Sequence, residues 1–130
     1  MMDKDVIKGE TPIIFLAMFW GGGGPYTISQ VIHVYDWINR DIPSREDLEV
    51  AFNTLLSLDF ISMKDDKFTI QRKIGNDFDA FRKKKRISKF KTARLYFEQY
   101  PLPTDIPNVI SISQERYAEE YAKYSKAFES

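Results

Sequence analysis

Residues 44–70 read SREDLEVAFNTLLSLDFISMKDDKFTI, and this stretch decides which fold the sequence predicts. Its first half has the pattern of an amphipathic helix. Ser44 is followed three residues later by Asp47, a spacing typical of a capped helix start. The buried stripe of this helix consists of Leu48, Phe52, Leu55 and Leu56.

The second half of the stretch changes from a helical to an alternating pattern after Asp59. Polar and apolar side chains alternate over 67–70, and Phe60, Ile61 and Met63 predict another strand just before them. Asp65 and Asp66 supply the turn between the two runs. The sequence therefore predicts a hairpin of two short strands directly after a helix.

Two further elements precede residue 44. Thr11 suits a helix cap and Pro12 a first helical turn. Residues 13–20 are apolar without interruption, so they predict either a short buried helix or a buried strand. Four glycines and a proline at 21–25 end this element.

The second element is an amphipathic helix that starts at Thr27 and runs to about Asn39. Thr27 and Gln30 have the spacing of a capping box. Its buried stripe consists of Ile28, Val31, Ile32, Tyr35 and Ile38. Three ordered elements and a hairpin are thus expected over residues 11–74.

This order resembles a winged-helix domain, and three motifs carry the resemblance. Residues 27–32, TISQVI, resemble the opening of a helix-turn-helix. Residues 48–61 resemble the end of a recognition helix that runs into the first wing strand, and KDDKFTI at 64–70 resembles the wing. The chain is most similar to small uncharacterised bacterial proteins of transcriptional-regulator type. The resemblance implies a DNA-binding role, with double-stranded DNA as the partner. A cytoplasmic location is expected separately, because the sequence shows no convincing targeting or membrane segment and has no cysteine.

The last third of the chain lies outside this resemblance. From Gly75 the pattern is helical, but its phase slips at 82–86, so the helix either breaks there or packs on two surfaces. A proline-rich linker follows, and the final helix starts near Ser113. We therefore expect an α+β, mostly helical protein: a winged-helix domain with a two-stranded wing over 1–74, and a C-terminal helical extension over 75–130.

The formal net charge of zero hides a segregated chain. Residues 1–80 hold 8 basic and 13 acidic side chains, whereas residues 81–100 hold 8 basic and 1 acidic. Residues 101–130 hold 3 basic and 5 acidic side chains. Because a basic run is the usual footprint of phosphate binding, the segment 81–100 becomes the main electrostatic candidate.

The DNA-binding candidates come from three places. The resemblance implies that Arg45 and Asn53 contact DNA from the third helix, and that Lys64 and Lys67 hold phosphates from the wing. The basic run adds Arg82, Lys83, Lys84, Lys85, Arg86 and Lys89. The predicted outer face of the third helix otherwise carries Glu46, Glu49, Val50 and Ser57, which is poor in donors for base edges.

A protein-interaction module without DNA binding is the alternative. His33 and Trp37 share a helix face opposite the core stripe, although we expect other helices to cover that face. The final helix carries one narrow aromatic stripe, Tyr117, Tyr121, Tyr124 and Phe128. This stripe either folds back on its own chain or pairs with a second copy, and we expect a homodimer through these C-terminal helices.

The glycine run offers a third hypothesis, a phosphate or small-ligand sensor. Free backbone N–H groups ahead of a helix can cradle a phosphate. The run lacks the Lys-Ser/Thr ending of a P-loop and the spaced glycines of a dinucleotide site.

Composition argues against several classes of protein. The absence of cysteine removes disulfides and thiolate metal sites, and a single histidine removes a multi-histidine site. No pair of carboxylates has a persuasive acid–base spacing, so we expect no enzyme, cofactor or metal. The longest apolar run, 13–20, is far below the roughly 20 residues of a membrane helix.

Overall fold

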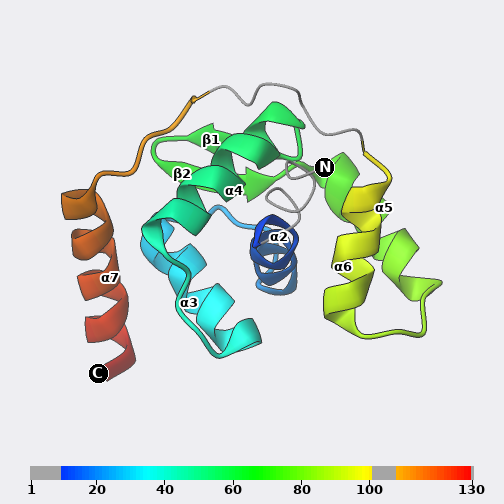
Figure 1. The fold of residues 1–130 in the computed structure, drawn as a ribbon, viewed down its shortest axis with the longest axis horizontal. Coiled ribbons are helices and arrows are strands. Elements are labelled where there is room, and N and C mark those ends of the chain that lie inside the picture. The colour runs from blue at the N-terminus through cyan, green and yellow to red at the C-terminus, as the bar shows by residue number, and fades with distance from the viewer. Residues whose placement is uncertain (1–9, 101–107, 130) are drawn as a thin grey trace.

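A computed structural model describes residues 10–100 and 108–129, with side chains described as far as residue 126. The fold is α+β and mostly helical, as predicted (Figure 1). The elements in chain order are α2 (Thr11–Trp20), α3 (Ile28–Asn39), α4 (Arg45–Ser57), β1 (Ile61–Lys64), β2 (Lys67–Ile70), α5 (Arg72–Lys83), α6 (Lys89–Glu98) and α7 (Gln114–Glu129).

Helix α2 is the centre of the core. All of its residues from Thr11 to Met18 are buried, because α3, α4 and α6 pack around it. A helix that is apolar on every side belongs in such a position, and this explains why its sequence lacks helical periodicity. Thr11, expected as the cap, is instead the first helical residue, and Glu10 is the N-cap.

Helices α3 and α4 begin as the sequence predicts. Thr27 and Ser44 each form a complete capping box, with Gln30 and Asp47 respectively. These reciprocal bonds satisfy backbone donors that a helix start leaves unpaired. The predicted stripes face α2, so the three helices share one apolar centre.

The hairpin is tied to the segment between α2 and α3. Strands β1 and β2 are antiparallel, with Ile61 opposite Ile70. Tyr26 forms an isolated antiparallel bridge with Phe68, in which each backbone N–H donates to the other residue's carbonyl at 2.8 Å. The Phe68 ring stacks on Phe52 of α4 at 4.0 Å between centroids. Helices and hairpin therefore form one packed unit.

The glycine run closes against this hairpin. The Ile70 amide donates to the Gly23 carbonyl at 2.8 Å. A Cβ at Gly24 would lie 2.5 Å from the Phe68 carbonyl oxygen, and its φ of +103° disfavours any other residue. Glycine at this position lets the loop approach the strand backbone.

The helical pattern breaks between α5 and α6, which was one of the two predicted alternatives. The aromatic residues of both helices pack on α2: the Phe15 ring lies 5.3 Å from the rings of Phe78 and Phe97 and stacks on Tyr96 at 6.3 Å. The predicted boundary at 74/75 therefore does not divide the core, because residues on both sides of it fill the same apolar cluster.

Helix α7 folds back along α3, on the opposite side of the fold from α5 and α6 (Figure 1). Tyr124 is buried there and its hydroxyl donates to the Asp36 carboxylate. The Tyr117 hydroxyl donates to the Pro43 carbonyl at 2.7 Å, whereas Tyr121 stays exposed. Part of the aromatic stripe of α7 therefore packs against its own chain, which is one of the two arrangements that the sequence predicts. The Phe128 side chain lies outside the described residues.

Candidate functional site

Part of the outer face of α4 is covered by the chain itself, although Glu46, Val50 and Ser57 on that face stay exposed. Residues 108–112 run along it, and Asn53 is only 5% exposed. The Asn53 amide donates to the Ile110 carbonyl at 2.9 Å and accepts from the Ile110 N–H at 2.9 Å. The prediction that Asn53 lies on an exposed face is therefore wrong.

Arg45 and Glu49 continue this series of bonds. Arg45 donates to the Ile112 carbonyl at 2.9 Å, and Glu49 accepts from the Ile112 N–H at 2.7 Å. Glu49 also lies 3.5 Å from the Arg45 guanidinium. Arg45, expected to reach a phosphate, is therefore engaged by its own chain, and we define Arg45, Glu49, Asn53 and residues 108–112 as the α4 strap.

The strap has a simple geometric origin. Four residues of an α-helix rise about 6 Å, and two residues of an extended chain span about 6.6 Å. Glu49 and Asn53, four apart on α4, therefore meet Ile112 and Ile110, two apart on the extended segment. Arg45 bonds the Ile112 carbonyl as well, so both backbone groups of Ile110 and of Ile112 are satisfied. The spacing of Arg45, Glu49 and Asn53 was visible in the sequence, but their partner was not.

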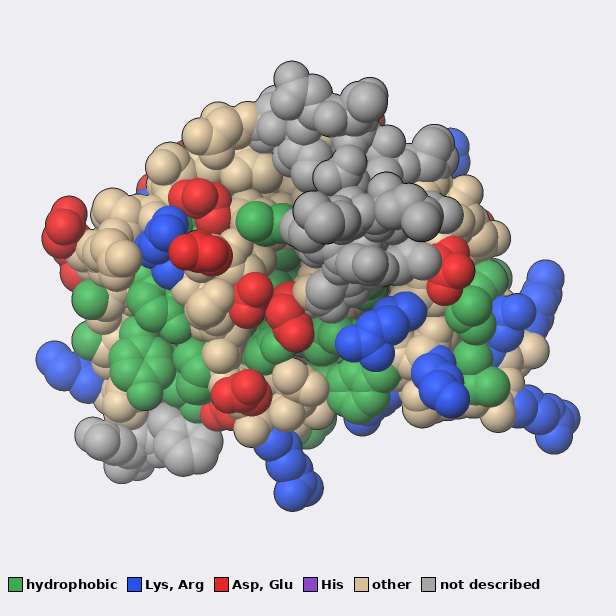
Figure 2. All heavy atoms as spheres, viewed as in Figure 1, with side chains coloured by type: hydrophobic (Ala, Val, Ile, Leu, Met, Phe, Trp, Pro, Cys, Tyr) green, Lys and Arg blue, Asp and Glu red, His purple; other side chains and the backbone are tan. Residues whose placement is uncertain are grey.

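The end of α5, the turn after it and the start of α6 carry the basic run. We call residues 82–91 the basic loop. Its cations Lys83, Lys84, Lys85, Arg86 and Lys89 are all exposed, and Figure 2 shows Lys and Arg side chains projecting from this end of the molecule. The basic loop therefore presents its charge to solvent.

Asp79 neutralises part of this charge. It accepts from Arg82 at 2.7 Å and lies 3.1 Å from the Lys83 ammonium. The hydrogen bond from Lys83 and the charge of Arg82 hold the pKa of Asp79 below its ordinary value. Among the residues that the structure describes, no carboxylate forms an ion pair with the remaining cations of the loop, Lys84, Lys85, Arg86, Lys89 and Lys91.

Several of these cations lie over aromatic rings. The Arg82 guanidinium carbon is 5.0 Å from the Trp20 ring centroid and 5.6 Å from that of Phe19. The Lys85 ammonium is 4.9 Å from the centroid of Phe81. Such contacts leave a cation charged while fixing its direction.

The β1–β2 hairpin lies far from the basic loop. Lys64 and Lys67 face each other across the hairpin, next to the turn at Asp65 and Asp66. Both lysines are exposed, as expected, but the tip carries as many carboxylates as ammonium groups. Figure 1 shows this turn and the loop between α5 and α6 on opposite sides of α2. The two groups of candidates therefore do not form one surface.

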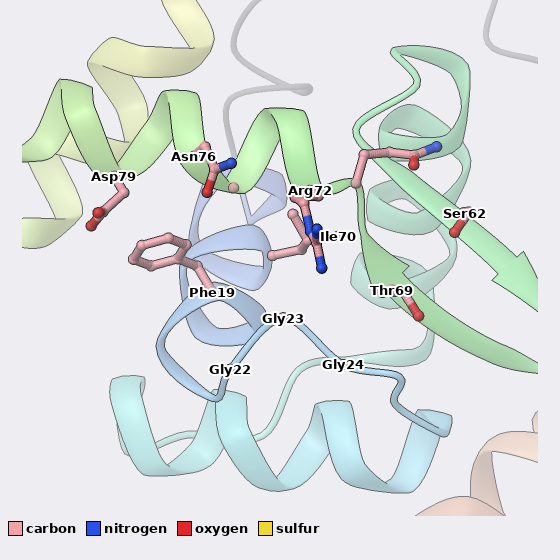
Figure 3. Close-up of a pocket in the computed structure, with 12 residues that line it drawn as sticks. Phe19, Gly22, Gly23, Gly24, Ser62, Thr69, Ile70, Arg72, Asn76 and Asp79 are labelled. Atoms are coloured by element: carbon pink, nitrogen blue, oxygen red, sulfur yellow. The ribbon is translucent and has the colours of Figure 1, made fainter.

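A hollow of about 590 Å³ lies beside the glycine run (Figure 3). The hairpin and the start of α5 complete its lining, and the Arg72 side chain reaches toward the glycines. Three of the loop amides are already used: Gly21 donates to Ala17 at 3.0 Å, Gly22 to Phe19 at 3.1 Å and Gly23 to Met18 at 2.8 Å. The N–H groups of Gly22 and Gly23 therefore point into the protein rather than toward a phosphate.

The face of α3 that carries His33 and Trp37 is covered only in part. The His33 ring packs edge-on against Tyr124 of α7, with 5.8 Å between centroids. Trp37 is 73% exposed, so the expectation that another helix covers it is wrong. A tryptophan this exposed is a candidate contact residue.

Two general findings bear on the remaining function classes. Over residues 10–100 and 108–129, no three potential metal ligands come close enough together to hold an ion. None of the described helices is both long and apolar enough to cross a bilayer.

Comparison with known proteins adds no family: no protein-family model, no curated protein and no solved structure matches this chain.

Proposed function

We propose that this chain is a winged-helix protein that binds DNA, and that it does so through the basic loop rather than through α4. The order of three helices and a hairpin supports this fold. The bridge between Tyr26 and Phe68 supports it further, because it joins the segment between the first two helices to the wing. Function is argued separately, from the charges, since fold alone does not determine it.

The observation that carries the proposal is the exposure of unneutralised cations in the basic loop. A helix that merely balanced the acidic part of its own chain would have carboxylates beside its lysines. Within the described part of the chain, only Asp79 has that role here. Lys84, Lys85, Arg86 and Lys89 are therefore available for a polyanion, and nucleic-acid phosphates are the polyanion that such clusters bind.

The mode of binding follows from which side chains are free. Arg45 and Asn53 are bonded to Ile112 and Ile110 within the α4 strap, so the two side chains expected to contact DNA from this helix are occupied. Contacts to phosphates position a protein on DNA without reading its sequence. We therefore expect binding that tolerates sequence and weakens steeply with salt.

The experiment is charge reversal in the loop. The variant Lys84→Glu, Lys85→Glu, Arg86→Glu should lose roughly 100-fold or more in affinity for a 20-bp duplex at low salt, because three cations become three repelling carboxylates. The slope of log Kd against log salt should become shallower by roughly 3. Fluorescence anisotropy over a salt series measures both quantities.

A matched control reverses the same number of charges elsewhere. Lys64, Lys67 and Lys126 are exposed residues of the wing and of α7. Their reversal to Glu gives the same net charge but leaves the basic loop intact, so we expect a loss of only a few-fold. Equal losses in both variants would show that net charge, not the loop, governs binding and would refute the proposal.

Protein interaction is the second candidate, and the exposure of Trp37 favours it. Under this alternative, the purified chain shows no salt-sensitive association with DNA even at low ionic strength.

The homodimer through the C-terminal helices stays a prediction. Because Tyr117 and Tyr124 already bind α3 or the segment before α4, a dimer through α7 would need its remaining face, where Tyr121 is exposed. Light scattering of Tyr121→Ser against the parent chain tests that contact.

A further inference from the structure

We infer that the basic loop prefers single-stranded nucleic acid, and that a small hollow beside Trp20 takes one unpaired base. This inference rests on the proposed function and specifies its ligand. The observation behind it is that an exposed indole, an apolar floor and lysines without a carboxylate partner among the described residues meet at one place, where α2 ends against α5 and α6.

The hollow has a volume of about 190 Å³. Leu16 and Phe78 line its apolar base, and Trp20 and Ile87 add two exposed apolar side chains. Arg82, Lys85 and Lys89 contribute positive charge, and Thr92 completes the lining. Pockets that enclose a whole drug-sized molecule measure roughly 300–1,000 Å³. A volume below that range suits one planar ring system whose remainder stays in solvent, as a base attached to its backbone does.

Trp20 is held ready for stacking. The indole is 41% exposed, although large aromatics are usually more deeply buried. The Arg82 guanidinium lies over its ring, and Asp79 fixes that guanidinium through both Nε and Nη2. Aromatic rings, such as that of tryptophan, and arginine guanidinium planes are side-chain surfaces on which unpaired bases stack. The chain thus presents both in one fixed arrangement.

The charges beside the hollow match a phosphate backbone. Lys85 and Lys89 line it, and Lys84 and Arg86 occupy the same loop. In the portion of the chain that is described, none of these four forms an ion pair with a carboxylate. A strand that inserts one base beside Trp20 would bring its flanking phosphates among these cations.

Two other polyanions fit less well. In a duplex the base faces are covered by their neighbours, so a duplex cannot use the indole without losing a stacked base. An anionic bilayer would meet Ile87 and Trp20 but could not reach the recessed apolar floor, and bilayer binders present their apolar side chains outward. The concave shape therefore favours a single strand.

The test uses the full chain carrying Trp37→Phe, which leaves Trp20 as the only one of the two tryptophans. Labelled oligo-dT and a hairpin duplex with the same number of phosphates are titrated, with anisotropy and tryptophan emission recorded. We expect oligo-dT to bind roughly 10-fold more tightly than the duplex and to quench Trp20. In the parent chain, Trp20→Ala should weaken oligo-dT binding by roughly 5- to 100-fold and leave duplex binding unchanged.

Controls separate stacking from folding and from charge. Trp37→Ala removes an equally large exposed indole and should leave the preference intact. Trp20→Phe keeps an aromatic ring, and should retain most of the preference if Trp20→Ala proves unstable. Lys85→Gln with Lys89→Gln should weaken both ligands by similar factors, because phosphates are common to both.

The outcomes distinguish two statements: that the basic loop binds nucleic acid, and that it prefers a single strand. Equal affinity for oligo-dT and duplex, without quenching, overturns this inference and leaves the proposed function standing. No binding of either ligand overturns both. Binding to phosphatidylserine vesicles with a blue shift of Trp20, but not to oligo-dT, overturns both in favour of a lipid surface.

Discussion

The face of α4 and the basic loop differ in what their polar side chains already do. On α4, Arg45, Glu49 and Asn53 are bonded to the backbone of residues 108–112. In the basic loop, the exposed lysines outside the reach of Asp79 have no carboxylate partner among the described residues. The resemblance to winged-helix proteins directs attention to the first region, whereas the available charge lies in the second. Residue type indicates chemistry, but only partners decide which side chains remain free for a ligand.

The largest predicted effect is a loss of stability when the hydrogen bonds of the α4 strap are removed. Asn53→Ala removes both bonds to Ile110 and leaves its backbone N–H and carbonyl unpaired beside α4. We expect the free energy of unfolding to fall by about 2–3 kcal/mol, because unpaired buried polar groups cost about 1–3 kcal/mol each. Chemical denaturation measures the change.

Binding supplies the control for that variant. If α4 is only structural, Asn53→Ala keeps the DNA affinity of the parent chain at temperatures where it is folded. Asn76→Ala, which changes an exposed asparagine of α5, should leave stability nearly unchanged. A selective loss of DNA affinity in Asn53→Ala would return base contact to α4.

The second predicted effect is somewhat smaller and concerns the stability that α7 contributes by packing on α3. The hydrogen bond to Asp36, together with burial, raises the pKa of Tyr124 to about 12. The protonated phenol is therefore favoured in the folded state, so its contribution is complete below pH ~10 and is lost as the pH rises toward 12. We expect a loss of about 2 kcal/mol across this window.

Tyr124→Phe isolates that contribution from those of other tyrosines. Burial also raises the pKa of Tyr35 and Tyr96, and their effects are common to the parent and the variant. The difference in unfolding free energy between the two proteins should therefore shrink between pH 10 and pH 12. A difference that stays constant over this range would argue against the bond to Asp36.

The smallest predicted effect lies in the basic loop itself. Asp79→Asn removes the carboxylate that neutralises Arg82 and Lys83, while its amide oxygen still accepts from Arg82. We expect DNA affinity to rise by roughly 2- to 5-fold at low salt, because one negative charge leaves the phosphate site. The gain should vanish in high salt, and an unchanged Kd at low salt would mean that the phosphates lie elsewhere.

The sequence predicted the local features of the fold and missed those that depend on distant partners. The capping boxes at Thr27 and Ser44 and the turn at Asp65 follow from residues within a few positions of each other. The sequence of α2 fits both a helix and a strand, because burial on every side erases the periodicity that distinguishes the two.

The candidate site divides in the same way. The basic run is visible in the sequence as a charge pattern, and its side chains from Lys83 to Lys89 are exposed in the structure. The hydrogen bonds that occupy the Asn53 amide could not be predicted, because its partner Ile110 is 57 positions away in the sequence. Trp20 ends an apolar run and so carries no sequence signal of a contact role, and only the fold brings it beside Arg82 and Lys85.

Amide chemical shifts of the ¹⁵N-labelled chain during titration with DNA test the central claim most directly. The account predicts that the largest perturbations fall on residues 82–91 and on the end of α2 at Trp20. Residues 45–57 and 108–112 should change little, because the strap stays closed. Dominant shifts along α4, with the strap opening as DNA binds, would contradict the account and restore the recognition helix as the reading surface.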